Sequence, residues 1–312
     1  MGFKSLYQFW HPDIAVDLGT ANTRVAVIRR GWQFSCPSSG TTAPALAQGV
    51  VVNIEAAAET LRPVLHHLKR RGVLRPRALA CAPTDTSAEE RERVREVCRR
   101  AGIEAVVLMP EPVAAALGDG VNYSSDCPTL LMDIGDGVTD CAIIRGGRLL
   151  ESHACRTGCA DLRAAVQIGV ERWCGYLLSD TDAIQLLSEV GIESLSYPND
   201  GLPSLRFVSL PKHSSADAID IPAGVVQEAI RPVRDQILQT IHTLLTANAS
   251  LHRELQQNGL RLSGGGALIP GFDTSIAQST GFSVRVVRNP LDAVVNGAKR
   301  VLPIMAENAM WH

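Results

Sequence analysis

The stretch AVDLGTANTRVAVI, residues 15–28, indicates the fold because it reads as two apolar strands joined by a short turn of small residues. The stretch LLMDIGDGVTDCAII, residues 130–144, repeats this order, with an aspartate before a glycine-containing turn. Such turns direct several backbone N–H groups toward one point, which suits phosphate oxygens. The chain therefore contains two candidate phosphate-binding hairpins. Ordinary hairpins with aspartate as a turn residue are the alternative.

The remaining pattern predicts an α/β fold built twice. Strand-like runs occupy 13–18, 23–29, 78–82, 104–108, 129–133 and 140–145, and helix-like segments occupy 55–70, 87–101 and 112–118. From residue 129 the order begins again with a hairpin, followed by helices, a strand near 259–263 and a final helix from about residue 290. A duplicated α/β architecture with a ligand cleft between its halves explains this repetition.

A third glycine-rich element, RLSGGGALIPGF at 261–272, lies between a buried strand and a short helix. Three glycines in a row let a flat ring lie against the backbone, so this loop suits the base or sugar of a nucleotide. The aspartates that precede the two hairpin turns, Asp17 and Asp133, cannot bind phosphate directly because like charges repel. A hydrated divalent cation between them and the phosphates removes this conflict, so the sequence predicts Mg²⁺.

Composition excludes several classes of protein. The chain has 312 residues, of which 46% are hydrophobic and 20% charged, and a net charge of −2. These values fit a soluble globular protein of two domains and do not favour a nucleic-acid partner. The eight cysteines form no CxxC pair, which is typical of a reducing cytosol. No apolar run reaches the roughly 18 residues that span a bilayer, and no signal peptide is recognisable.

The N-terminal segment has an amphipathic pattern. Phe3, Leu6, Tyr7 and Trp10 recur at helical spacing. This predicts either a helix at a membrane interface or a short helix folded against the protein's own surface. The sequence alone leaves both interpretations open.

Taken together, these motifs resemble the MreB family of bacterial actin homologues, within the actin, chaperone and sugar-kinase ATPase superfamily. The resemblance rests on DLGTANTRVAVI, LACAPTDTSAEERERVREVCRRAG, LMPEPVAAALGDG, LLMDIGDGVTDCAII, LSGGGALIPGF and VRNPLDAVVNGAKRVL, which occur in the family's order. It implies a duplicated ribonuclease-H-like, two-lobed ATPase fold with a nucleotide cleft between the lobes. It also implies ATP and Mg²⁺ as ligands and self-assembly into filaments. The expected location is the inner face of the cell membrane, where proteins of this family organise cell-wall synthesis together with elongation proteins.

The resemblance assigns site residues. The first phosphate loop comprises Asp17, Gly19, Thr20, Ala21 and Asn22, the second Asp133, Gly135, Gly137 and Thr139, and the adenosine loop Gly264, Gly265, Gly266 and Ala267, with Gly158 near the ribose. Asp17 and Asp133 are expected to hold Mg²⁺ through water. Glu111 matches the acid that positions or activates the attacking water, a chemistry suited to a carboxylate. The alternative for Glu111 is an acid favoured by the dipole at a helix N-terminus.

The resemblance also implies a domain layout. Residues 1–12 form the amphipathic segment, 13–128 the first lobe together with a C-terminal helix at 299–312, and 129–298 the second lobe, with a small subdomain at about 180–222. Only the connector SCPSSGTTAPALA, residues 35–47, stands where the family builds the small outer subdomain of the first lobe. That subdomain is therefore expected to be largely missing. The loop RGVLRPR at 71–77 places Val73 and Leu74 at a predicted membrane contact.

Several positions depart from the family pattern. Asp136 and Val138 stand where glycine and threonine are usual, Cys159 and Ala160 replace Gly-Asp near the ribose, and Ile184 and Leu187 replace a Glu and a Lys near the adenosine. These departures predict nucleotide binding that is weakened, altered in base preference or lost. The resemblance implies a slow ATP hydrolase coupled to polymerisation, and the alternative is a nucleotide-binding-impaired scaffold that acts through partner contacts. A small-molecule kinase on the same fold lacks an evident acceptor-site base.

Overall fold

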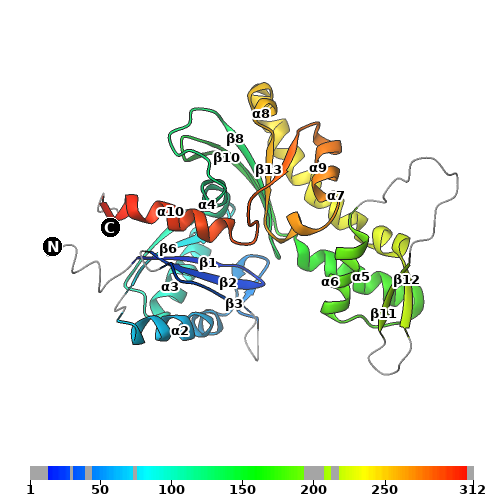
Figure 1. Cartoon of the computed structure of the whole chain (residues 1–312), viewed down its shortest axis with the longest axis horizontal. Coiled ribbons are helices and arrows are strands. Elements are labelled where there is room, and N and C mark those ends of the chain that lie inside the picture. The colour runs from blue at the N-terminus through cyan, green and yellow to red at the C-terminus, as the bar shows by residue number, and fades with distance from the viewer. Residues whose placement is uncertain are drawn as a thin grey trace.

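Figure 1 shows the computed structural model, which describes residues 13–28, 31–38, 44–72, 76–192, 207–211 and 218–307. The predicted membrane-contact residues Phe3, Leu6, Tyr7, Trp10, Val73 and Leu74 lie outside these ranges. Within the described ranges, no helix is both long enough and apolar enough to cross a membrane.

Two five-stranded sheets with the same topology form the centres of two lobes. The first has the order β3-β2-β1-β6-β7 and the second β10-β9-β8-β13-β14. In each, the first two pairs are antiparallel and the last two are parallel. The first sheet comprises β1 (Asp13–Leu18), β2 (Asn22–Val27), β3 (Gln33–Pro37), β6 (Arg77–Ala82) and β7 (Ala105–Pro110), and the second β8 (Thr129–Ile134), β9 (Thr139–Arg145), β10 (Arg148–Cys155), β13 (Leu260–Ser263) and β14 (Val284–Val286). The predicted duplicated α/β fold is confirmed.

The sequence patterns missed β3 and β10, the edge strand at the antiparallel end of each sheet. Their residues alternate between partly buried and exposed positions, and β3 contains polar residues and a proline. An edge strand pairs with one neighbouring strand only, so it does not need the continuous apolar run that is typical of a central strand. Between β3 and α2, the described residues hold only the short strands β4 (Leu46–Ala47) and β5 (Val50–Val51), as expected for a shortened segment.

Four helices pack on the first sheet: α2 (Ile54–Arg70), α3 (Ala88–Ala101), α4 (Glu111–Gly118) and α10 (Ala293–Glu307). Helix α3 begins at a capping box in which Glu90 N donates to Ser87 Oγ and Ser87 N donates to the Glu90 carboxylate. It ends at Gly102, whose φ of 99° is left-handed. These limits confirm the predicted helix.

The second lobe carries α5 (Cys159–Cys174), α6 (Asp180–Val190), α7 (Ala223–Ala247), α8 (His252–Asn258), α9 (Phe272–Thr280) and the small sheet β11 (Phe207–Pro211) with β12 (Ala218–Pro222). Figure 1 shows α5, α6 and this small sheet at the right of the molecule, away from α2 and α3 at the lower left. One apolar core joins α5, α6 and α7 to the second sheet. Helix α7 ends at Ala247 with Asn248 as its cap, and a short 3₁₀ turn, Ala249–Leu251, joins it to α8.

The lobes meet along α4 and α10. The chain passes from the first lobe to the second through residues 119–128 and returns through residues 287–292. A buried cluster around α4 and α10 includes side chains from both sheets, such as Ala15 and Leu79 of the first and Leu131 and Ile144 of the second. This shared core fixes the floor beneath the space between the lobes. The predicted domain limits remain predictions, and α10 begins at Ala293, before the predicted limit at 298.

Candidate nucleotide-binding site

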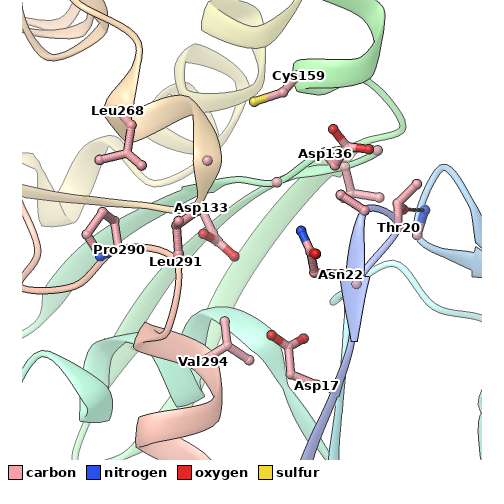
Figure 2. Close-up of a pocket in the computed structure, with 18 of the residues that line it drawn as sticks. Asp17, Thr20, Asn22, Asp133, Asp136, Cys159, Leu268, Pro290, Leu291 and Val294 are labelled. Carbon is pink, nitrogen blue, oxygen red and sulfur yellow. Dashed lines mark hydrogen bonds between the residues drawn. The ribbon is translucent and has the colours of Figure 1, made fainter. Parts of the chain in front are cut away.

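A cavity of about 480 Å³ lies between the lobes, within the usual range for small-molecule sites. Eleven of the predicted site residues line it: Asp17, Gly19, Thr20, Ala21, Asn22, Glu111, Asp133, Gly135, Gly137, Gly264 and Gly265. They come from the two hairpin turns, the start of α4 and the loop after β13. Figure 2 shows Asp17 and Asp133 pointing toward the same space, with Asn22 beside them. The structure thus brings together elements that are far apart in the sequence.

The two hairpin turns have equivalent geometry. Gly19 N donates to Asn22 O at 3.2 Å, and Gly135 N donates to Val138 O at 2.8 Å. The turns also approach one another across the cavity, since a Cβ added to Gly137 would lie 2.7 Å from Thr20 Oγ1. A Cβ on Gly19 would lie 2.8 Å from Asn22 O and one on Gly135 would lie 3.0 Å from Val138 O, so glycine permits these tight turns, whose backbone suits phosphate oxygens.

Four predicted residues lie behind the cavity wall. Thr139, Gly158, Gly266 and Ala267 are not among its lining residues. Thr139 is buried and its hydroxyl donates to Thr157 O at 2.8 Å. A Cβ on Gly158 would lie 2.6 Å from Gly135 O, and one on Gly266 would lie 2.3 Å from Ile134 Cγ2. In this structure these residues therefore shape the backbone of the turns.

Three acids line the cavity, Asp17, Glu111 and Asp133, and a fourth, Asp140, is buried next to Asp133 on the neighbouring strand. Burial is the main reason that each has a raised pKa. Burial raises the pKa of Asp17 to about 7, with Arg24 opposing the shift and Asp133 adding to it. The pKa of Glu111 lies well above its usual range through burial and the charges of Asp17 and Asp133. Burial also raises the pKa of Asp133, against a hydrogen bond from Ser263 at 2.6 Å. Such a cluster favours a cation.

The fourth acid, Asp140, connects the lobes. Its two carboxylate oxygens accept hydrogen bonds from Thr84 N and Thr84 Oγ1, both at 2.7 Å. Burial nevertheless raises the pKa of Asp140 to about 7. Asp140 is the cross-strand neighbour of Asp133, whereas the equivalent neighbour of Asp17 is Arg24. The duplicated hairpins therefore differ in charge at matching positions.

Sequence reasoning missed Arg24, which lines the cavity. Its guanidinium lies 3.7 Å from Asp17 and 3.4 Å from Asp292. A hairpin register drawn around the turn at 19–22 would have placed Arg24 opposite Asp17, on the same face of the sheet. Arg24 thus holds positive charge beside the first acid.

The unusual residue Asp136 has a specific partner. Arg163, on α5, places Nη1 2.6 Å from Asp136 Oδ1, and both residues line the cavity. The unusual Val138 is buried, and its Cγ2 would lie 2.4 Å from a Cβ on Gly49. Of the two residues that depart from the family pattern, Asp136 is therefore paired with a positive charge and Val138 is packed close to Gly49.

The side of the cavity near α6 and the glycine loop is apolar. Its lining residues there are Cys159, Ile184, Leu187, Leu268, Ile269, Pro290 and Leu291. Figure 2 shows Leu268, Pro290 and Leu291 on one side of the cavity and Asp136 and Thr20 on the other. The cavity can therefore accommodate a ligand that has a flat apolar ring at one end and a charged chain at the other.

The raised acids predict a pH dependence. Asp17 and Asp140 titrate at about 7 in the folded protein, against an ordinary value of 3.8. Because the folded state binds these protons more tightly, their stabilising contribution is full below pH about 3.8 and is lost as pH rises through 7. The melting temperature of the nucleotide-free protein should therefore fall from about pH 4 to about pH 7, the interval between the ordinary and the raised pKa values. Asp140→Asn should make this decline shallower in a thermal-shift series, and an unchanged slope would contradict the assignment.

The duplicated sheets and the glycine-lined cleft between them define the actin-like class of two-lobed proteins. A family model described as MreB/Mbl protein matches residues 40–309, and the chain belongs to this family. The cell shape-determining protein MreB of Escherichia coli strain K12 is 26% identical over 94% of this chain and 94% of its own. Cell shape-determining protein Mbl of Bacillus subtilis strain 168 is also 26% identical, over 94% of this chain and 96% of its own.

Solved structures share the fold. MreB5 of Spiroplasma citri bound to ADP superposes with a TM-score of 0.84 at 21% identity, over 96% of this chain and 98% of its own. A MamK double helical filament gives a TM-score of 0.74 at 18% identity, over 94% of this chain and 99% of its own. The predicted actin-like fold and family membership are thus confirmed.

Proposed function

We propose that this protein binds ATP in the interlobe cleft, assembles into filaments at the inner face of the cell membrane and organises cell-wall synthesis to determine cell shape. The observation that carries the proposal is the convergence of both hairpin turns, Glu111 and the glycine loop on one cavity. Family membership and the names of the relatives, which are cell shape-determining proteins, support the cellular role.

The cavity fits a nucleoside triphosphate. The two turns, which the bonds from Gly19 N to Asn22 O and from Gly135 N to Val138 O close, would hold the phosphates through the backbone N–H groups that lie between these positions. The apolar side, including Leu268 and Leu291, would contact the adenosine together with Gly264 and Gly265. MreB5 of Spiroplasma citri has been solved with ADP and with AMPPNP, which supports the same class of ligand here.

The acids fit a hydrated Mg²⁺. Within the described part of the chain, no three metal-ligating side chains lie close enough to bind a metal directly. Asp17 and Asp133 would therefore hold the ion through water, while phosphate oxygens complete its shell. Their raised pKa values favour a cation nearby, since a positive charge stabilises the ionised carboxylates. When bound, Mg²⁺ would neutralise charge on the phosphates.

Glu111 is suited to act on the water that attacks the terminal phosphate. It begins α4 and faces the cavity beside Asp17 and Asp133. Burial raises the pKa of Glu111, and a bound cation would oppose this shift and favour the ionised carboxylate that can accept a proton. Positioning a water with a carboxylate contributes roughly 10²- to 10⁴-fold to a reaction rate.

Sedimentation and phosphate release test this function together. The full chain should pellet with Mg-ATP and release phosphate slowly. Glu111→Gln should lower phosphate release by about 10²-fold while ATP still binds, whereas Asp17→Asn should abolish ATP-dependent pelleting. Filament formation by MamK supports the expected pelleting. A protein that stays monomeric with Mg-ATP, with Glu111→Gln releasing phosphate at the unchanged rate, would contradict the proposal.

Membrane attachment is the further part of the proposed function. The amphipathic spacing of Phe3, Leu6, Tyr7 and Trp10 supports it. The full chain should float with vesicles of anionic lipid, and a chain lacking residues 1–10 should float several-fold less. Equal flotation of both chains would reject the N-terminal segment as the anchor.

A further inference from the structure

A second cavity, of about 570 Å³, lies outside the nucleotide cleft where the two lobes join. The end of α4, the chain segment that follows β14, and α10 contribute to its walls. Figure 1 shows α4 and α10 side by side at this junction. The volume is within the range of small-molecule sites.

Basic side chains dominate this cavity, which we call the junction cavity. Its lining contains Arg285, Arg288, Lys299 and Arg300 against a single carboxylate, Asp119. Four positive charges and one negative charge leave a net charge of +3 on the lining. The whole chain, in contrast, has a net charge of −2, so this local excess is not a general property of the surface.

The single carboxylate is already fully engaged. The Asp119 side chain is 2% exposed and forms an ion pair with Arg261 at 3.1 Å and another with Arg285. It also accepts a hydrogen bond from Arg288 N at 3.3 Å. Asp119 therefore has little capacity left to neutralise the other basic side chains of the junction cavity.

Within the part of the chain that the structure describes, three cations of the junction cavity have no carboxylate partner. Arg300 donates from Nη1 to the carbonyl oxygen of Leu117 at 2.7 Å, a neutral acceptor. Among the described residues, neither Arg288 nor Lys299 has an acidic side chain within ion-pair distance. Like charges that line one concave surface repel one another and focus a positive potential into it. A multiply charged anion would relieve this repulsion.

The donor set matches phosphate chemistry. Arginine offers a planar fork of N–H donors and lysine a compact charge, and both are preferred partners of phosphate oxygens. The amides of Asn289 and Asn296 also line the junction cavity and can add neutral hydrogen bonds. We propose that the junction cavity binds a phosphate-bearing anion, either free in solution or as the headgroup of an anionic lipid.

Binding of inorganic pyrophosphate tests the proposal by calorimetry on the full chain, with ADP present so that the nucleotide cleft is not available. The test variant is Arg288→Glu with Lys299→Glu. The matched control is Arg91→Glu with Arg253→Glu, which changes the net charge equally at exposed helix positions outside both cavities. We expect the full chain and the control to bind alike, and the test variant to lose about tenfold or more in affinity.

A second arm separates the two sources of phosphate. Vesicles that contain phosphatidylglycerol are compared with vesicles of phosphatidylcholine alone. Binding to anionic vesicles that falls in the test variant but not in the control supports the proposal with a lipid headgroup as ligand, even if pyrophosphate does not bind.

Three results would overturn the proposal: no binding of either probe, equal loss in the test and control variants, or binding of a polyglutamate peptide instead of both phosphate probes. If the test variant does not fold, Arg288→Gln and Lys299→Gln replace it, and retained affinity in both of these variants would also overturn the proposal.

Discussion

Gly297→Ala is expected to lower the free energy of unfolding by about 3 kcal/mol, the upper end of the typical range of about 1–3 kcal/mol for overpacked cores. A Cβ at position 297 would lie 1.7 Å from Ala114 O and 2.9 Å from Gly118 N, and one on Gly118 would lie 2.0 Å from Ala293 O. Helices α4 and α10 thus cross with their backbones in contact. A backbone carbonyl cannot rotate away as a side chain can, so even one methyl group must push the helices apart.

The same substitution is expected to weaken nucleotide binding. Glu111 begins α4, and Val294 near the start of α10 lines the same cleft, so separating the helices displaces both. Chemical denaturation and ATP titration measure the two effects. Gly224→Ala is the matched control, because Gly224 lies in α7 with no atom within 4 Å of its added Cβ. This control should stay within about 1 kcal/mol of the parent chain. Similar losses in both variants would refute the helix-crossing explanation.

The hairpins and their acids could be predicted because local chemistry determines them. A turn of small residues between two apolar strands strongly favours a hairpin. The repetition of this order in the chain then predicts two sheets with a cleft between them. The structure accordingly places Asp17, Asp133 and Glu111 at one cavity. The capping box before α3 is local in the same sense, since Ser87 and Glu90 are three residues apart.

The charge partners of the cleft could not be predicted, because they depend on how distant elements dock. Arg163 meets Asp136 because Cys159 N and Ala160 N, at the start of α5, donate to carbonyl oxygens of the second turn at 3.0 Å and 2.8 Å. Thr84 meets Asp140 because the loop after β6 lies against β9. No periodic pattern in the sequence predicts these two contacts between distant segments.

The apolar side of the cleft could be predicted only in part: the sequence indicated Ile184 and Leu187 but not Leu268, Pro290 and Leu291. Leu268, Pro290 and Leu291 look like ordinary loop or core residues, yet Leu268 is 55% exposed and Leu291 45% exposed at the cavity. An exposed leucine indicates a binding site only when the fold shows which cavity its side chain lines. The sequence therefore predicted the residues of the two turns more fully than the residues of the apolar side.

Arg163→Ala is expected to reduce ATP affinity by about 10- to 100-fold, because truncating one partner leaves the other charge of a mostly buried pair uncompensated. The side chains of Arg163 and Asp136 are 18% and 15% exposed, so some solvent screening remains. Without Arg163, the Asp136 carboxylate would stand unpaired in a turn that is proposed to hold phosphate. The Asp136 carboxylate and a phosphate group bound in the same turn would repel each other.

Asp136→Gly provides the compensating change. Alone it should leave ATP affinity equal to or higher than that of the parent chain, because it removes the repelling carboxylate. Calorimetric titration with ATP of both single variants and the double variant forms a double-mutant cycle. Arg172→Ala is the matched control, since Arg172 lies exposed on the same helix and outside the cavity. Parent-like affinity in Arg163→Ala would refute the role of the pair.

The cycle also separates two actions of Arg163. If Arg163 only neutralises Asp136, Arg163→Ala should have no effect once residue 136 is glycine, and the coupling should equal the whole effect of the single substitution. If Arg163 also donates to the phosphates, part of the loss should persist in the glycine background. We expect the first result, because Arg163 Nη1 already lies 2.6 Å from Asp136 Oδ1 and this contact holds the guanidinium against the turn. A full loss that persists in the glycine background would show that the arginine acts on the ligand and not on Asp136.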